Sequence, residues 1–172
     1  MSNAGLLVIG SGPAGVAAAE AYRARQADHA VRILTADTDP PYQRPPLSKD
    51  FLRGDTDDSA MEISRPFETI LKAQVDEIDV GQRVVTASGV RYEYDRLVIA
   101  SGASPQPLSV PGGEKALLLR SFDDARRLRE AATSATTAVV IGAGFIGCEA
   151  AASLAIRGLS VTLIAPEEFP QQ

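Results

Sequence analysis

The chain has 172 residues, of which 45% are hydrophobic and 23% are charged, and its formal net charge is -5. This composition predicts a folded globular protein, with one hydrophobic core or with one domain and part of a second. The acidic balance argues against a nonspecific nucleic-acid binder or a binder of anionic membranes, because each needs an excess of Lys and Arg.

Residues 6–37 predict a β-α-β unit of about 30 residues. The letters LLVI predict a short buried strand, GSGPAG a glycine turn, residues 16–26 an Ala-rich helix, and VRILTA a second strand before Asp37. The first apolar run is too short for a signal-peptide core or a membrane span. A cytoplasmic location is therefore the default expectation.

The segment PYQRPPLSKDFLRG, residues 41–54, combines three prolines and a glycine with two arginines and a lysine. Its prolines and glycine exclude a long helix or a central strand. A Pro-stiffened segment loses little entropy when it becomes ordered, so we expect it to hold its cations at fixed points.

Residues 83–102 predict a hairpin with Ser88-Gly89 at the turn, followed by an apolar strand over residues 96–100. The next letters, ASPQPLSVPGGE, are rich in Pro and Gly, so we expect a crossing linker near residues 103–115. The chain is accordingly divided into residues 1–108 and 109–172.

Residues 138–167 repeat the pattern of the first unit. AVVI predicts a strand, GAGFIG a turn, residues 148–157 a helix, and SVTLIAP a strand before Glu167. Upstream, residues 121–132 predict a helix with Ser121 as its N-cap. One β-α-β unit cannot cover both faces of a parallel sheet, so we expect the second domain to be incomplete and the chain to be truncated.

Gly10, Gly12 and Gly15 form a G-x-G-x-x-G pattern between a predicted strand and a predicted helix, the context in which this pattern binds a dinucleotide. The first glycine permits the tight turn, the second lets a pyrophosphate approach the backbone, and the third lets helix and strand pack closely. The helix N-terminus adds free amides. Asp37, 22 residues after Gly15, is near the spacing of a ribose-binding carboxylate; Asp39 and a solvated strand-end acid are the alternatives.

Gly142, Gly144 and Gly147 repeat the pattern, so two dinucleotides are expected, and electron transfer between them is the natural reason for two such sites. The candidate for the ribose-binding acid after the last strand is Glu167, which follows Ala165 and Pro166. No Arg or Lys follows in PEEFPQQ to hold a 2′-phosphate, which favours NADH over NADPH.

Cys148 and His29 are the single cysteine and the single histidine. They exclude an internal disulfide and a Cys or His metal cluster within this chain, so no metal site is expected. Cys148 is interpreted as a small packing residue on the second motif's helix, with a redox role as the alternative.

Five ordered features resemble the ferredoxin reductase branch of the FAD- and NAD(P)-dependent pyridine nucleotide oxidoreductases, which is related to oxygenase-coupled reductases and to apoptosis-inducing factor. They are the first glycine motif, RPPLSK at 44–49, YDRLVIASGASP at 94–105, VPG at 110–112 and GAGFIGCE at 142–149. The resemblance implies an α/β fold. Residues 1–108 would be the N-terminal part of a Rossmann-like FAD-binding domain, a parallel sheet with a β-hairpin/meander layer, and residues 109–172 the incomplete start of a Rossmann-like NAD(P)-binding domain.

The resemblance also assigns cofactor roles to the residues that match the family's motifs. FAD would lie against the first glycine motif, the Pro-stiffened loop, the residue whose backbone meets the adenine, and the turn after the apolar strand. NAD(P)H would lie against the second motif. The residues are Gly10, Gly12, Pro13, Ala14, Gly15, Asp37, Arg44, Pro45, Lys49, Val75, Ala100, Ser101 and Gly102 for FAD, and Gly142, Gly144, Phe145, Ile146, Gly147, Glu149 and Glu167 for NAD(P)H.

Lys49 and Glu149 are the expected catalytic pair. The resemblance places a carboxylate near the nicotinamide, on the first turn of the second motif's helix, opposite a lysine beside the flavin. A buried ammonium needs a partner, and a paired lysine would stabilise negative charge on the reduced ring; two unrelated surface charges are the alternative. Disulfide-reducing members of the superfamily carry two close cysteines in this region, where this chain has Lys49, Asp50 and Phe51. Direct passage of electrons from flavin to an external acceptor is therefore expected.

The resemblance implies that hydride passes from NAD(P)H to FAD and that single electrons then pass to a ferredoxin-like iron-sulfur protein, such as that of an oxygenase system. Oxygen, a quinone or nitrite reductase centres are alternative acceptors on the same scaffold. An inactive fragment, or a nucleotide-binding module, is the non-enzyme alternative. No nucleic-acid or membrane partner is expected, and the oligomeric state is left open.

Overall fold

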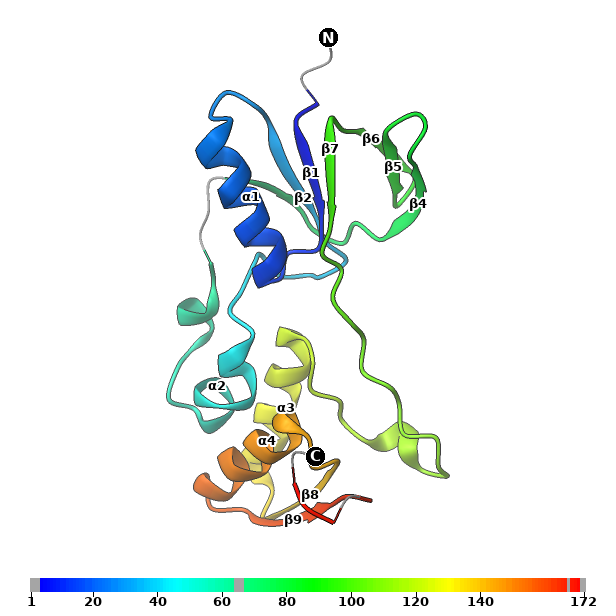
Figure 1. Cartoon of the computed structure of the whole chain (residues 1–172). Helices are drawn as coiled ribbons and strands as arrows, with labels where there is room; N and C mark the ends of the chain where they lie inside the picture. The colour runs from blue at the N-terminus through cyan, green and yellow to red at the C-terminus, as the bar shows by residue number, and fades with distance from the viewer. Residues whose placement is uncertain (1–3, 64–66, 167, 171–172) are drawn as a thin grey trace. The chain divides into compact units, whose positions relative to one another are not determined.

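The computed structural model describes residues 4–63, 67–166 and 168–170, and the chain forms two compact units (Figure 1). The first contains residues 1–43 and 62–103, and the second contains residues 44–61 and 104–172. Residues 44–61 therefore pack with residues 104–172, although residues 62–103 separate these two segments in the sequence. The division into cofactor domains at residue 108 stays a prediction, since compact units are not defined by what they bind.

The first unit contains a parallel sheet and one long helix. Their bounds are β1 Leu6–Ile9, α1 Pro13–Arg25, β2 Val31–Leu34, β3 Glu68–Ile70 and β7 Arg96–Ile99. The strand order is β3-β2-β1-β7, with Leu6 level with Val31 on one side and with Arg96 on the other. The prediction of a parallel sheet that begins with a β-α-β unit is therefore confirmed.

A three-stranded antiparallel meander covers the face of this sheet opposite to α1 (Figure 1). Its strands are β4 Val75–Asp79, β5 Val84–Ala87 and β6 Val90–Glu93. Because side chains alternate along a strand, Leu6 and Val8 of β1 pack toward α1, whereas Leu7 and Ile9 pack toward the meander. The continuous apolar run of β1 follows from burial on both faces.

The predicted hairpin turn joins β5 to β6. Ser88 has φ 48° and Gly89 has φ 77°, and two positive φ values in a two-residue loop match the right-handed twist of the flanking strands. The hairpin prediction is confirmed, together with the meander layer.

The second unit combines two parallel strands with helices and short 3₁₀ turns. Their bounds are η1 Pro45–Ser48, α2 Asp50–Arg53, η2 Asp58–Met61, η3 Gly113–Lys115, α3 Phe122–Ser134, β8 Thr137–Ile141, α4 Phe145–Ile156 and β9 Ser160–Ile164. Helix α4 packs on both strands, and α2 packs on α3 and α4. The buried cluster of this unit takes Leu52 from α2 and Leu154 from α4. The Pro-rich segment 41–54 forms only short turns of helix, as its composition predicts.

Helices α1 and α4 begin three residues earlier than their sequences predict, at Pro13 and Phe145 instead of at residues 16 and 148. Each begins directly after the second glycine of its motif, and Gly12 and Gly144 are N-caps with extended backbone. Pro13 is suited to the first helical position because its φ is preset and it has no N–H to leave unsatisfied. One consequence is that Glu149 lies in the second turn of α4, not in the first.

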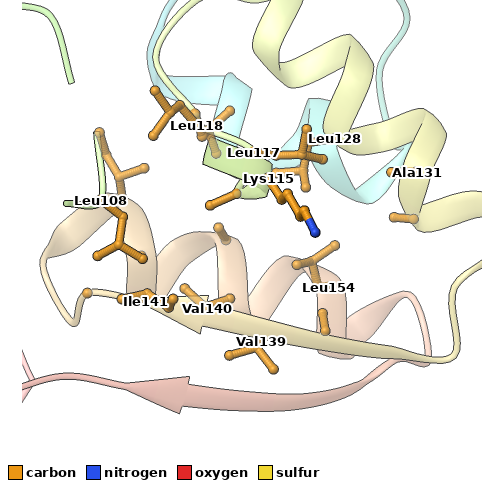
Figure 2. A pocket seen from close by; sticks show the side chains of 18 of the residues that line it. Leu108, Lys115, Leu117, Leu118, Leu128, Ala131, Val139, Val140, Ile141 and Leu154 are labelled. Carbon is orange, nitrogen blue, oxygen red and sulfur yellow. The ribbon is translucent and has the colours of Figure 1, made fainter. Parts of the chain in front are cut away.

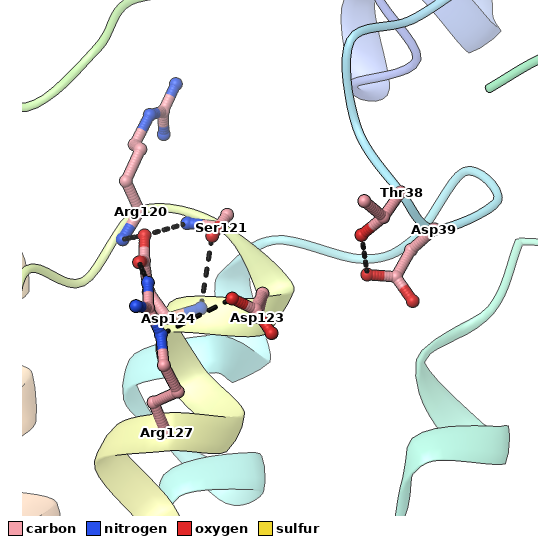
Figure 3. Close-up of polar contacts among 7 residues, drawn as sticks. All are labelled: Thr38, Asp39, Arg120, Ser121, Asp123, Asp124 and Arg127. Carbon is pink, nitrogen blue, oxygen red and sulfur yellow. Dashed lines mark hydrogen bonds and ion pairs between the residues drawn. The ribbon is translucent and has the colours of Figure 1, made fainter. Parts of the chain in front are cut away.

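Helix α3 begins with a reciprocal capping box (Figure 3). Ser121 Oγ accepts a hydrogen bond from the Asp124 backbone at 3.1 Å, and Asp124 Oδ2 accepts one from the Ser121 backbone at 2.9 Å. Burial raises the pKa of Asp124, but the hydrogen bonds from Ser121, Arg127 and the Arg120 backbone together hold that pKa below its ordinary value. The prediction of Ser121 as the N-cap is confirmed.

Ser121→Ala is expected to lower the free energy of unfolding by about 1 kcal/mol, because it leaves an amide of the first turn without its acceptor. The folded pKa of Asp124 is depressed, so the stability contributed by the ionised carboxylate is present above the unfolded pKa, about 3.9. That contribution is lost as the pH falls through the folded pKa. Urea unfolding at neutral and acidic pH measures both effects, with Ser121→Thr as the control that keeps the hydroxyl. Equal stability of the alanine variant at neutral pH would contradict the prediction.

Candidate functional site

The first glycine motif forms a tight turn that only glycine permits at two positions. Gly10 has φ 106°, and a Cβ there would overlap the Ala100 carbonyl; a Cβ on Gly15 would overlap the Gly10 carbonyl and lie 3.2 Å from Val8 Cγ1. The backbone of Gly10 donates to the Leu34 carbonyl at 2.8 Å. The predicted steric roles of the first and third glycines are confirmed by this geometry.

The N-terminus of α1 is open to an anion. Gly12 provides no side-chain cap, and no acid lies in the first turn. Pro13 has no N–H, so Ala14 and Gly15 carry the first amides that the turn can present. A helix of 13 residues adds a partial positive charge at this end, which suits a phosphate.

Two hydroxyls that sequence patterns did not single out anchor this turn to the end of β2. Ser11 Oγ donates to Thr35 Oγ1 at 3.0 Å, and the Asp37 backbone donates to the same Thr35 oxygen at 3.2 Å. Ser11 and Thr35 are 2% and 6% exposed, so the interaction is internal to the unit. Ser11 occupies a variable position of the glycine pattern, which carries no signal for such a contact.

The Asp37 carboxylate is oriented at both oxygens. Tyr42 Oη donates to Asp37 Oδ2 at 2.8 Å, and the Thr38 backbone donates to Oδ1 at 3.1 Å. Asp39, the register alternative, accepts a bond from Thr38 Oγ1 at 3.4 Å (Figure 3). The ribose role of Asp37 stays a prediction, with a fixed carboxylate in its favour.

The predicted FAD-binding residues of the first unit converge on one edge of the sheet. Ile9 is level with Leu34 and with Ile99, so the glycine turn, the chain after β2 and the turn that begins at Ala100 all follow the carboxyl ends of neighbouring strands. The Ala73 backbone donates to the Thr35 carbonyl at 2.8 Å, which brings the chain just before Val75 to the same edge. Crevices at this end of parallel strands are where open α/β sheets bind ligands.

The second glycine motif repeats the first turn within the second unit. Gly142 has φ 107°, its backbone donates to the Ile164 carbonyl at 2.8 Å, and a Cβ on Gly147 would overlap the Gly142 carbonyl. A Cβ on Gly142 or Gly144, however, would meet nothing within 4 Å. The second turn therefore has the same backbone geometry as the first. The space beside Gly142 is open, however, whereas the Ala100 carbonyl fills the space beside Gly10.

An open apolar hollow of about 1020 Å³ lies beside this second turn, between β8, α3, α4 and the segments before them (Figure 2). Val139 and Ile141 of β8 are 62% and 55% exposed there, and the predicted NAD(P)H residues Phe145 and Ile146 of α4 also line it. The lining is mainly aliphatic. The turn at its margin is thus the part that offers backbone amides to a phosphate.

Lys49 and Glu149, the predicted catalytic pair, form an ion pair with 3.1 Å between Lys49 Nζ and Glu149 Oε1. Ser48 Oγ donates to Glu149 Oε2 at 2.6 Å. The Ser48 hydroxyl and the Lys49 ammonium outweigh the opposing effect of burial and lower the pKa of Glu149. The side chains of Lys49 and Glu149 are 43% and 29% exposed, so both groups of the pair are partly buried. The role of the pair at a nicotinamide stays a prediction.

The other predicted residues fall as follows. Arg44 and Pro45 lie at the start of η1 in the second unit. Cys148 is partly buried in α4, and its Sγ donates to the Ala143 carbonyl at 3.3 Å. Glu167 lies outside the described residues.

Residues 4–63, 67–166 and 168–170 contain no helix that is both long and apolar enough to cross a bilayer. Within the same ranges, no group of three or more His, Cys, Asp or Glu side chains is placed to hold a metal ion.

Comparison with known proteins identifies relatives of the whole chain. The family model described as pyridine nucleotide-disulphide oxidoreductase matches residues 5–171. A rubredoxin-NAD(+) reductase of Pseudomonas putida is 37% identical over 169 residues, which are 92% of this chain and 44% of that protein. The chain therefore spans less than half the length of this relative.

Two solved structures extend the comparison. The ferredoxin reductase for the CYP199A2 system from Rhodopseudomonas palustris matches with a TM-score of 0.86 and 32% identity, over 92% of this chain and 42% of that one. A water-forming NADH oxidase from Lactobacillus brevis, bound to NADH, matches with a TM-score of 0.83 and 27% identity, over 94% of this chain and 39% of that one. The resemblance that rested on five ordered sequence features is confirmed.

Proposed function

Because the chain belongs to the pyridine nucleotide-disulphide oxidoreductase family, we propose that it is part of a flavin-dependent NAD(P)H oxidoreductase that reduces an iron-sulfur electron carrier. The observation that carries the proposal is the Lys49–Glu149 ion pair, whose lysine belongs to the region that carries two close cysteines in disulfide-reducing members of the superfamily. The similarity to a rubredoxin reductase and a ferredoxin reductase supports the class of acceptor.

The first unit fits an FAD. Its glycine turn has no side chain at Gly10 or Gly15, the amides of Ala14 and Gly15 point from the start of a 13-residue helix, and the Asp37 carboxylate is oriented by Tyr42. We assign the diphosphate to the turn and a ribose hydroxyl to Asp37. The family resemblance adds Val75 and Ala100–Gly102 of the same unit to this set.

The second unit fits a nicotinamide dinucleotide at Gly142–Gly147. A Cβ on Gly144 would meet no atom of the chain within 4 Å, so the space over this glycine is free for a phosphate to approach the backbone. The α4 N-terminus has no side-chain cap and no acid in its first turn. The preference for NADH rests on the absence of Arg and Lys from residues 166–172.

Bound FAD would supply the chemistry of accepting a hydride and releasing electrons one at a time. The chain supplies charge and placement. The Lys49 ammonium, held by Glu149, provides a fixed positive charge that stabilises negative charge on a neighbouring ring. Glu149, kept ionised by Ser48 and Lys49, fixes the direction of that ammonium.

A dithiol mechanism within this chain is excluded despite the family's name, because Cys148 is its single cysteine. Oxygen as the acceptor is the second candidate, and the similarity to a water-forming NADH oxidase favours it. The two candidates differ in what consumes the electrons, not in how the chain binds the cofactors.

Titration of the purified chain with FAD, followed by NADH under anaerobic conditions, tests the proposal. We expect FAD fluorescence to change on binding and the visible flavin absorbance to bleach with NADH faster than with NADPH. Addition of an oxidised rubredoxin or ferredoxin should restore the absorbance, whereas restoration only by air would favour the oxidase. A chain that binds no FAD would refute the proposal for this chain.

Lys49→Ala is expected to retain FAD but to slow flavin reduction by NADH on the order of 100-fold, the range found when one preorganised charge donor is removed. Lys49→Arg is the matched control, since it keeps a positive charge at the same position and should slow the reaction much less. Stopped-flow absorbance measures the rate. An unchanged rate in Lys49→Ala would remove Lys49 from the chemistry.

A further inference from the structure

One face of α4 carries three polar side chains that all bind the segment from Ser48 to Leu52. Glu149, Ser153 and Arg157 are spaced four residues apart, so they lie one above another on the helix. Ser153 Oγ donates to the Ser48 carbonyl at 2.7 Å, and Arg157 Nη1 donates to the Leu52 carbonyl at 2.8 Å. With the bond from Ser48 to Glu149, helix α4 holds this segment at three points.

Ser48 is bonded at both its backbone and its side chain. It is 6% exposed, and Ser153, which holds its carbonyl, is 2% exposed. An ionised carboxylate only accepts hydrogen bonds, so the Ser48 hydroxyl has to be the donor to Glu149 Oε2 at 2.6 Å. This leaves the other carboxylate oxygen, Oε1, to the Lys49 ammonium at 3.1 Å.

We propose that Ser48 is a positioning residue for the Lys49–Glu149 pair. Its hydroxyl, held in place through Ser153, fixes one oxygen of the Glu149 carboxylate so that the other faces the ammonium. The purpose of this arrangement rests on the proposed function, whereas the arrangement itself is independent of any cofactor. A fixed donor is needed because the Lys49 side chain is 43% exposed and would otherwise exchange its carboxylate partner for water.

Ser48 and Lys49 are the side chains that bind the Glu149 carboxylate. In the described part of the chain, the arginines of α2 and α3 are bonded elsewhere, and Arg157, the C-cap of α4, binds a carbonyl. Those contacts are Arg53 with Asp50 and Asp55, Arg126 with Asp58, Arg127 with Asp123 and Asp124, Arg129 with the Thr56 carbonyl, and Arg157 with the Leu52 carbonyl. Ser48 is also the largest cause of the lowered pKa of Glu149, which agrees with a direct bond to the charged form.

Titration of the Glu149 carboxyl by carbon-13 NMR in the cofactor-free chain tests the proposal, with Glu149→Gln to assign the signal. We expect Ser48→Ala to raise the pKa of Glu149 and Ser48→Thr to restore it. Ser153→Ala should raise it by less, because the hydroxyl remains but its backbone is no longer held. Should Ser48→Ala not fold, Ser48→Cys supplies a weak donor of similar size and should also raise the pKa. An unchanged Glu149 titration in a folded Ser48→Ala or Ser48→Cys variant overturns the proposal.

A second readout connects the contact to catalysis and separates the two proposals. The acid limb of the pH profile for flavin reduction by NADH should move to higher pH in Ser48→Ala, because a raised pKa of Glu149 protonates the carboxylate at higher pH. At neutral pH the rate should fall by less than in Lys49→Ala, and KM for NADH should change less than kcat. An acid limb that stays in place despite a shifted Glu149 titration overturns the positioning role. A chain that binds no FAD refutes the proposed function alone, because the NMR titration still decides the contact.

Discussion

Gly15→Ala is expected to destabilise the first unit by about 3 kcal/mol, the upper end of the usual range for overpacking, and to abolish FAD binding. The added Cβ would overlap the backbone carbonyl of Gly10 and approach Val8 Cγ1 at 3.2 Å. A backbone oxygen cannot move aside as a flexible side chain can, so β1 and α1 would have to separate, and overpacking of this kind is strongly destabilising.

Urea unfolding followed by circular dichroism measures the loss of stability, and fluorescence titration measures the loss of FAD binding. Gly81→Ala is the matched control in the same unit, because a Cβ on Gly81 meets only the Asp79 carboxylate oxygen at 3.4 Å. A Gly15→Ala variant as stable as the Gly81→Ala control would contradict the packing role assigned to the third glycine.

Phe51→Ala is expected to lower the free energy of unfolding of the second unit by about 3–5 kcal/mol, the range for removing a buried phenylalanine. Phe51 is 1% exposed. Its ring meets the Phe122 ring edge to face, with 5.0 Å between centroids, and the Arg129 guanidinium lies 4.8 Å from its centroid. Such ring contacts contribute beyond the buried area alone.

The same variant should also disturb the ion pair next to it in sequence, because Phe51 attaches the segment that carries Ser48 and Lys49 to α3. Thermal and urea unfolding measure the stability, and the carbon-13 titration of Glu149 reports on the ion pair. Phe51→Leu, which keeps most of the apolar volume, should lose much less stability. A loss below about 1 kcal/mol for Phe51→Ala would show that the core closes over the gap, unlike a rigid core.

The parts of the fold that follow from short sequence patterns were predictable. The contact of Gly15 with Gly10 and that of Gly147 with Gly142 join residues five positions apart, the hairpin depends on Ser88-Gly89, and the start of α3 depends on Ser121 and Asp124. Each of these is decided by backbone geometry or by bonds between near neighbours, so the sequence order alone contains the reason. The early starts of α1 and α4 were missed because the prediction followed the apolar residues and not the glycine N-caps.

The parts that depend on distant contacts were not predictable. Leu52 packs in one cluster with Leu154 and Leu159, which lie about a hundred positions later in the sequence. No local sequence pattern predicts such a partner. The pairing of Lys49 with Glu149 came from the family resemblance, not from spacing. Ser48 and Ser153 were missed altogether, because a serine gives no periodic signal and acquires its role only where α4 meets η1.

The grouping of residues 44–61 with residues 104–172 means that the chain passes from one unit to the other after residues 43, 61 and 103. A protease that cleaves one of these crossings leaves the units joined by the other two. A fragment that begins at residue 104 would lack Leu52, a member of its own buried cluster, and the complementary fragment would carry that leucine without its partners. Splitting the chain between the units for complementation or reporter designs therefore requires a break at each of the three crossings, with residues 44–61 rejoined to residues 104–172 as in a permuted sequence.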